Sequence, residues 1–237
     1  MQKADTTTAT QNELEKRIGK LSAPSKMPGY AWGIPASRCI TGSKLRLQKG
    51  TSCEKCYACK GRFLWPNVQT AYERRYQAWA NDPNWGMLIA QLIALQTPIG
   101  DPYFRWFDSG DLQSVKMLHD ISDVCERLPD IQFWLPTQER GFVREFLESR
   151  SLPNNLVVRV SAPEIGGPRP QGHDCTSTVL PRIPKGHGAR WDRWEARVAR
   201  STAARTYCPA TISDKYECGS CRACWDPNVS NVVYLEH

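Results

Sequence analysis

Apolar and polar positions alternate regularly through the middle of the chain. Three short apolar runs are typical of strands, at residues 103–107, 131–135 and 156–160. Between them, residues 112–128 and 141–148 carry apolar side chains at helical spacing, and Asp111 stands where a helix N-cap is expected. This alternation of strands and helices predicts an α/β fold with a parallel sheet and right-handed crossovers.

The ends of the chain differ from its middle. Residues 1–26 are rich in Thr, Lys and Ser, and we expect them to be disordered apart from a short helix near residues 13–18. Residues 235–237 resemble the start of a histidine tag, so His237 takes no part in the functional interpretation. We therefore expect residues 27–234 to form a single α/β metal-binding domain.

Segments outside the alternating middle complete the predicted organisation. Helices are expected at residues 68–80 and 85–95, and residues 163–188 are dense in Pro and Gly, which predicts a long excursion. A basic helix over residues 191–204 follows. Its arginines at one helical face are Arg193, Arg197 and Arg200. They form either a solvated face or a stripe that follows a nucleic-acid backbone.

Composition narrows the class of protein. Of the 237 residues, 41% are hydrophobic and 23% are charged, which is typical of a soluble globular protein with a core. No apolar run is long enough to span a membrane, and the first residues do not resemble a secretory signal. We expect a cytosolic protein, in which ten cysteines indicate metal binding or redox chemistry rather than disulfides.

Eight of the ten cysteines form two similar groups, each a lone cysteine followed by a C-x-x-C-x-x-C run. Their members are Cys39, Cys53, Cys56 and Cys59 in residues 35–62, and Cys208, Cys218, Cys221 and Cys224 in residues 205–226. Neighbouring thiolates at this spacing can converge on one metal centre, and the lone cysteine can complete the set. The sequence predicts metal at both groups.

The metal itself has two interpretations. Four thiolates suit tetrahedral zinc and equally a [4Fe-4S] cluster. Three cysteines in one run favour a cluster, because zinc sites usually pair two C-x-x-C knuckles. One shared centre and two separate centres are both compatible with the sequence. Cys125, inside a predicted helix, is interpreted as a small buried hydrophobic residue, and Cys175 as a spare ligand or a bystander.

Polar residues follow the predicted strands where a parallel sheet gathers its ligands. Asp108 and Asp111 come after the first strand, and Thr137 comes after the second. Because the carboxyl ends of parallel strands meet at one edge of the sheet, we interpret these three as candidate cofactor-binding residues. Ordinary loop and cap chemistry is the alternative.

A nucleic-acid-binding module with structural zinc is the alternative function. It rests on the formal charge of +7, the predicted arginine face and nine tryptophans that could stack on bases. Core packing is the default explanation for those tryptophans. The sequence contains no Ser-His-Asp arrangement, phosphate loop or H-E-x-x-H motif, and it does not decide whether the protein is an enzyme.

Several segments together resemble the phage gene product 88 family. The matching pieces are Cys53–Ala58 with Gly61, Phe104–Asp111, Phe133–Trp134 with Thr137, Cys208–Ala210 and Cys218–Trp225. This family is similar to radical S-adenosylmethionine proteins. The resemblance implies a phage-encoded iron–sulfur protein with a partial (β/α) barrel-like parallel sheet, working in the host bacterial cytoplasm with a redox or host protein as partner.

The resemblance leaves the chemistry open. In radical S-adenosylmethionine enzymes a C-x3-C-x2-C motif holds a cubane cluster and leaves one iron for the cofactor. Here the spacing is C-x2-C-x2-C with an upstream Cys39, and Cys59 is less typical of the family than Cys39, Cys53 and Cys56. If Cys39 fills the fourth position, no iron is left for S-adenosylmethionine. The expected function is therefore electron transfer, sensing or radical-type chemistry.

Overall fold

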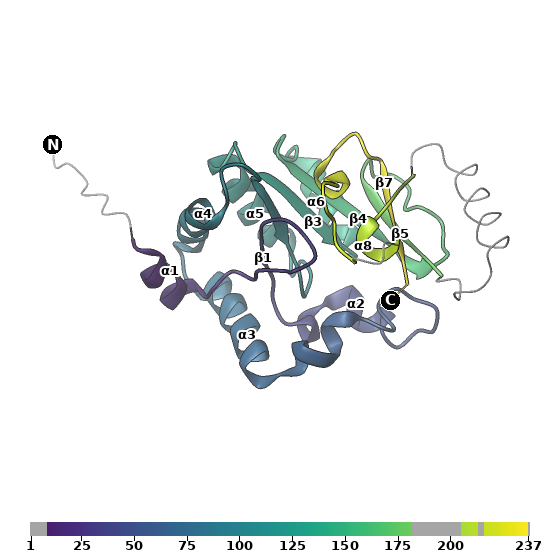
Figure 1. Ribbon diagram of the computed structural model, residues 1–237, viewed down its shortest axis with the longest axis horizontal. Coiled ribbons are helices and arrows are strands. Elements are labelled where there is room, and N and C mark those ends of the chain that lie inside the picture. The colour runs from purple at the N-terminus through teal and green to yellow at the C-terminus, as the bar shows by residue number, and fades with distance from the viewer. Residues whose placement is uncertain (1–8, 182–204, 213–215, 237) are drawn as a thin grey trace.

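A seven-stranded parallel sheet runs through the protein (Figure 1). The computed structural model describes residues 9–181, 205–212 and 216–236. The strands are β1 (Tyr30–Trp32), β2 (Tyr103–Trp106), β3 (Gln132–Thr137), β4 (Leu156–Ile165), β5 (Thr176–Leu180), β6 (Arg205–Tyr207) and β7 (Asn231–Leu235). Their spatial order is β1-β2-β3-β4-β5-β7-β6, and each pair of neighbours is parallel.

The α/β class and the parallel sheet are confirmed, but the expected barrel is not. The sheet is open, with β1 and β6 at its two edges. The outer edge of β1 is already paired, because Ser22 and Ala31 exchange backbone hydrogen bonds of 2.8 and 2.9 Å in an antiparallel bridge. This local pairing uses backbone groups that a closing strand would need.

The helices before and between the first strands are α1 (Gln11–Ile18), α2 (Ile40–Leu45), α3 (Pro66–Asn81), α4 (Trp85–Gln96), α5 (Val115–Arg127) and α6 (Arg140–Ser149), and a short α8 (Pro209–Ile212) follows β6. Five of the helices, α1, α3, α4, α5 and α6, agree with the sequence pattern, and α2 was not expected. The start of α5 corrects one expectation. Its N-cap is Ser114, whose hydroxyl accepts a hydrogen bond from the Met117 N–H at 3.2 Å, so Asp111 is not the cap.

The two faces of the sheet are covered differently. Successive side chains of a strand point to opposite faces, and Phe104 and Trp106 of β2 pack into the core under α4, α5 and α6. On the other face, Tyr103 of β2 and Trp134 of β3 pack against Trp225 in the C-terminal cysteine segment. The sheet therefore separates a helix-covered core from a face that the second cysteine group covers.

Both chain ends contribute more to the fold than the sequence suggested. The short helix expected near residues 13–18 is present as α1, and its Leu14 and Ile18 are buried in the core. Leu235, taken as part of a tag, is buried in β7, and the Glu236 N–H donates to the Leu180 carbonyl at 2.9 Å. The nearby Lys55 ammonium lies 2.8 Å from the Glu236 carboxylate.

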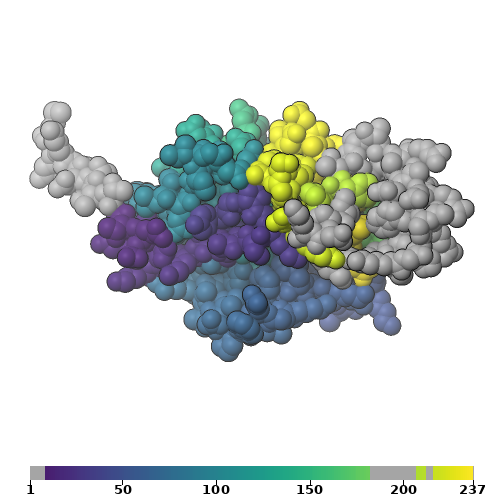
Figure 2. Space-filling view, in the orientation of Figure 1, coloured from purple at the N-terminus to yellow at the C-terminus, as the bar shows by residue number. Residues whose placement is uncertain are grey.

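The last strand brings the C-terminus beside the first cysteine segment. In Figure 1 the C-terminal end lies next to α2, in agreement with the Lys55–Glu236 ion pair. Figure 2 shows the C-terminal residues, in yellow, lying against the middle of the chain, in teal. The basic face at Arg193, Arg197 and Arg200 lies outside the described residues. No helix among the described residues is long and apolar enough to cross a membrane.

Candidate functional site

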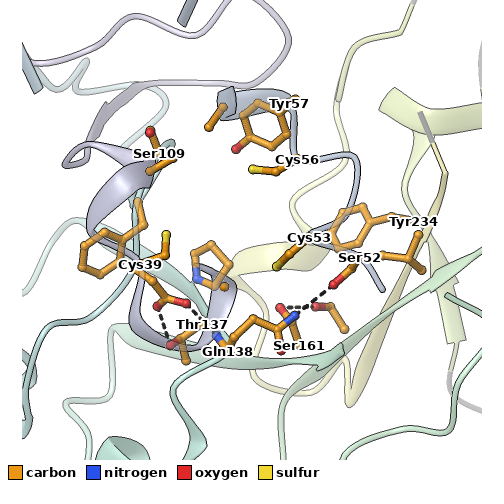
Figure 3. A pocket seen from close by; sticks show the side chains of 18 of the residues that line it. Cys39, Ser52, Cys53, Cys56, Tyr57, Ser109, Thr137, Gln138, Ser161 and Tyr234 are labelled. Atoms are coloured by element: carbon orange, nitrogen blue, oxygen red, sulfur yellow. Dashed lines mark hydrogen bonds between the residues drawn. The ribbon is translucent and has the colours of Figure 1, made fainter. Parts of the chain in front are cut away.

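A cavity of about 320 Å³ opens where the parallel strands end (Figure 3). The first cysteine segment forms one part of its lining through Cys39, Cys53 and Cys56. The loop that follows β2 contributes Asp111, and the last residue of β3 contributes Thr137. Two of the three strand-end residues predicted from the sequence therefore lie at the same cavity as three of the predicted metal ligands.

Three thiols reach the cavity from separate turns of the chain. Cys39 precedes α2, Cys53 lies in the turn after it, and Cys56 precedes the 3-10 turn Tyr57–Cys59. A Cβ atom at Gly42 would lie 3.6 Å from the Cys53 sulfur and 3.7 Å from the Cys39 sulfur. Both sulfur atoms thus approach one point, which the missing side chain of Gly42 leaves free. Figure 3 shows the three cysteine side chains around the hollow.

The fourth cysteine of this segment is set apart. Cys59 is not among the residues that line the cavity. Burial is the main cause that raises the pKa of its thiol, and the neighbouring Cys56 raises the pKa further. Cys59 therefore lies close to Cys56, although it does not line the cavity. Cys39, Cys53 and Cys56 thus line the cavity, whereas Cys59 lies beside Cys56 and outside the lining.

Two of the cavity thiols, Cys39 and Cys53, hold their protons in the metal-free chain. Burial raises the pKa of Cys39 far above its usual range, and nearby Asp111, Cys56 and Cys53 raise it further. Burial also raises the pKa of Cys53 to about 11. The Arg46 guanidinium lowers both values and is the basic group that favours the thiolates. Metal binding at this site must release these protons.

Asp111 ties together the loops at two strand ends. Its carboxylate accepts hydrogen bonds from the Thr137 hydroxyl at 2.6 Å, the Gln138 N–H at 2.8 Å and the Leu112 N–H at 2.8 Å. Burial raises the pKa of Asp111 to about 7, although these three hydrogen bonds lower it. The residue predicted to bind a cofactor therefore also fixes the shape of the cavity.

Asp108 occupies a different position. It is buried outside the cavity lining, and its Oδ2 accepts a hydrogen bond from the Tyr72 hydroxyl at 2.9 Å. Its Oδ1 is buried, with no hydrogen-bond partner among the described atoms. The structure thus places Asp108 against α3 and not at the cavity.

The pKa of Asp111 predicts a pH-dependent stability in the metal-free chain. Its ordinary value is 3.8 and its folded value is about 7, so between these values the folded state binds more protons than the unfolded state. Stability should fall as pH rises from about 4 to about 7 and level off above that, by an amount on the order of a few kcal/mol. Urea unfolding of chelator-treated protein across this range measures the slope. Asp111→Asn should flatten it, whatever that variant's absolute stability, and an unchanged slope would assign the effect to another group.

The second cysteine group forms a separate cluster on the opposite side of the sheet from the core helices. Cys208 and Cys224 are buried beside Trp134, Trp225 and Val232. Burial raises the pKa of Cys208 to about 12, and the nearby Cys224, Cys218 and Cys221 raise it further. All four predicted ligands of this group are therefore neighbours. None of the four lines the cavity of the first group.

Arg159 holds the segment with the second cysteine group in place. The sequence pattern did not identify this residue as important. The residue lies in β4 and is fully buried. Its guanidinium donates five hydrogen bonds, all to backbone carbonyls. The acceptors are Cys224, Ala223, Asp226, Val229 and Thr176, at 2.7 to 3.4 Å. A lone arginine within the strand run Leu-Val-Val-Arg-Val was the signal that could have identified a buried structural role.

The thiols of the metal-free chain are not arranged to coordinate a single metal ion. Among the described residues, no three His, Cys, Asp or Glu side chains are close enough together to hold one metal ion. Two cysteines lie outside both groups. Cys125 is buried in the core, as predicted, and the Cys175 thiol donates to the Pro227 carbonyl at 3.5 Å.

Sequence comparison identifies the family. The chain matches gene product 88 over residues 2–227, a range that includes both cysteine groups and every strand except β7. The chain belongs to the gene product 88 family. Gene product 88 is a family of phage gene products, and this part of the resemblance is confirmed. No curated protein and no solved structure matches the chain. The family match specifies no cofactor or reaction.

Proposed function

We propose that this member of the gene product 88 family is a phage-encoded iron–sulfur protein that binds a [4Fe-4S] cluster in the cavity. Cys39, Cys53 and Cys56 would hold the cluster. One observation carries the proposal: three thiols from separate turns line a single cavity at the carboxyl end of a parallel sheet. Such an edge is where open α/β sheets bind their ligands.

The size of the cavity favours a cluster over a single zinc ion at this site. Thiolates around one tetrahedral zinc lie about 3.8 Å apart, as follows from Zn–S bonds of about 2.3 Å. In a cubane each thiolate binds a different iron, so the thiolates stand farther apart. The cavity of about 320 Å³ offers the space that such a group needs.

Other residues of the chain would assist the binding. Arg46 favours the charged form of Cys39 and Cys53, which eases the loss of protons on metal binding. Three thiolates leave one iron for a different ligand, and when bound the cluster supplies electron transfer or an open iron position. This arrangement is compatible with radical-type chemistry, for which S-adenosylmethionine binding is the test, and equally with electron transfer to a redox partner in the host cytoplasm.

The second cysteine group would bind its own metal. Cys208, Cys218, Cys221 and Cys224 supply four thiols to one region, and four thiolates suit either a second cluster or structural zinc. Metal there would fasten the C-terminal cysteine segment to the sheet, because Trp225 and Cys224 already pack against Trp134.

The metal content of the protein tests the proposal. Protein purified without oxygen should be brown, with broad absorbance near 400 nm and about four iron and four sulfide per chain for the cavity centre. Additional iron or about one zinc per chain would identify the metal of the second group. Iron, sulfide and zinc are counted on one sample. A colourless protein with zinc and no iron would contradict the cluster and favour the zinc-stapled nucleic-acid module, whose DNA or RNA affinity should fall steeply with salt.

A further inference from the structure

Arg105 brings a positive charge to the cavity. It lies in β2, and its side chain lines the cavity together with Tyr57, Trp134 and Tyr234. The guanidinium carbon stands 4.6 Å from the centre of the Trp134 ring. Its Nη2 donates to the Tyr57 hydroxyl at 3.0 Å, and its Nη1 reaches the Met27 sulfur only at 4.0 Å.

Most of the hydrogen-bonding capacity of Arg105 is unused. A guanidinium carries five N–H groups, and these two contacts engage two of them. The Nε atom is buried without a hydrogen-bond partner among the described atoms. No carboxylate of the described residues forms an ion pair with Arg105. Arg105 is half-buried, and a charge partly withdrawn from water without an ion-pair partner is unfavourable, so this position favours an anion.

Other arginines near the same face of the sheet already form hydrogen bonds or an ion pair within the protein. Arg159 donates to five backbone carbonyls, and Arg222 pairs with the Asp101 carboxylate at 2.9 Å. Asp108 is the acidic residue that acts electrostatically on Arg105, but its carboxylate is hydrogen-bonded to Tyr72 instead. Arg105 therefore differs from these arginines in facing a cavity with free donors.

We propose that Arg105 binds the carboxylate or phosphate group of a small anionic ligand inside the cavity. Its planar fork matches both groups, which accept two parallel N–H hydrogen bonds. Ser161 and Ser177, whose hydroxyl oxygens are 3.0 Å apart, and Gln138 also line the cavity and supply further polar contacts. The proposal does not rest on a bound cluster, because the observations behind it are the buried Arg105 Nε without a described partner and the polar residues that line the cavity.

Calorimetric titration of the full chain with inorganic phosphate and, separately, with succinate tests this site. The wild-type protein should bind at least one probe, and the better probe identifies the ligand as a phosphate or a carboxylate compound. Arg105→Gln should weaken that binding about tenfold or more, since it removes a charge-assisted hydrogen bond. Arg62→Gln removes the same charge from an exposed position away from the cavity and should change affinity less than about twofold.

The results that would contradict anion binding by Arg105 differ from those that would contradict the proposed iron–sulfur function. Absence of binding by both probes, or equal affinity of Arg105→Gln and wild type, overturns the proposal. If Arg105→Gln does not fold, Arg105→Lys takes its place: it keeps the charge but loses the fork, so weaker binding supports the site and unchanged binding overturns it. Iron and sulfide are measured on the same samples. Anion binding without iron would refute the proposed function alone, and iron without anion binding would refute this inference alone.

Discussion

Replacing Cys39, Cys53 or Cys56 with alanine should each remove the cavity centre, with a loss of about four iron and four sulfide per chain. Each variant deletes one of the three thiols that line the cavity, and a cubane held by two thiolates is not retained. The loss is measured by iron and sulfide content and by the absorbance near 400 nm after purification without oxygen. It is the largest effect that the proposed site predicts for a single side chain.

Two substitutions serve as controls for this experiment. Cys59→Ala should keep the cavity iron, because Cys59 lies outside the lining although it belongs to the same sequence run. Cys175→Ala should also keep it, since that thiol contacts the Pro227 carbonyl and neither cysteine group. If Cys59→Ala loses as much iron as Cys56→Ala, Cys59 belongs to the ligand set and the three-thiol assignment fails.

Arg159→Met should destabilise the protein by about 3–5 kcal/mol. The substitution keeps much of the side-chain volume but leaves the carbonyls of Cys224, Ala223, Asp226 and Val229 without their donor in a buried region. Urea unfolding measures the loss of stability. Alkylation of the buried Cys208 and Cys224 should also become faster, because the segment that they occupy is no longer held to β4.

A surface arginine provides the matched control. Arg150 forms ion pairs of 2.6 and 2.7 Å with Asp123 and Glu126, whose side chains are more than half exposed. Arg150→Met should cost only about 0–1 kcal/mol. A similar loss in both variants would mean that the five carbonyl hydrogen bonds of Arg159 do not stabilise the C-terminal cysteine segment specifically.

The first strands and helices could be predicted from sequence because their signals are local. The amphipathic stretches that form α5 and α6 have apolar residues every three or four positions. This pattern is visible within a few helical turns and does not depend on distant residues. The start of α5 was misplaced because Asp111 and Ser114 are both good caps. The Asp111 carboxylate is not the cap because it accepts hydrogen bonds from Thr137, at the end of β3, and from the Gln138 N–H.

β5 and β7 were missed for different reasons. β5, Thr176–Leu180, begins with three polar residues that are buried. Their polarity is tolerated because the Thr176 hydroxyl hydrogen-bonds to the Ser230 carbonyl at 3.0 Å and to the Asn231 side chain at 2.9 Å, contacts that only the paired strand supplies. β7 is apolar enough to be a strand, but its last residue was taken for part of a tag.

The sequence by itself determined the parallel α/β order and the existence of two cysteine groups, since periodicity and C-x-x-C spacing are properties of short segments. Only the tertiary structure decided that Cys39, and not Cys59, joins Cys53 and Cys56 at the cavity. It also decided that Arg159 donates to backbone carbonyls, while the Arg105 Nε has no hydrogen-bond partner among the described residues. These outcomes depend on groups far apart in the chain, such as Arg159 and Cys224, which are 65 positions apart. Contacts of that range arise only when the sheet brings distant segments to the same face.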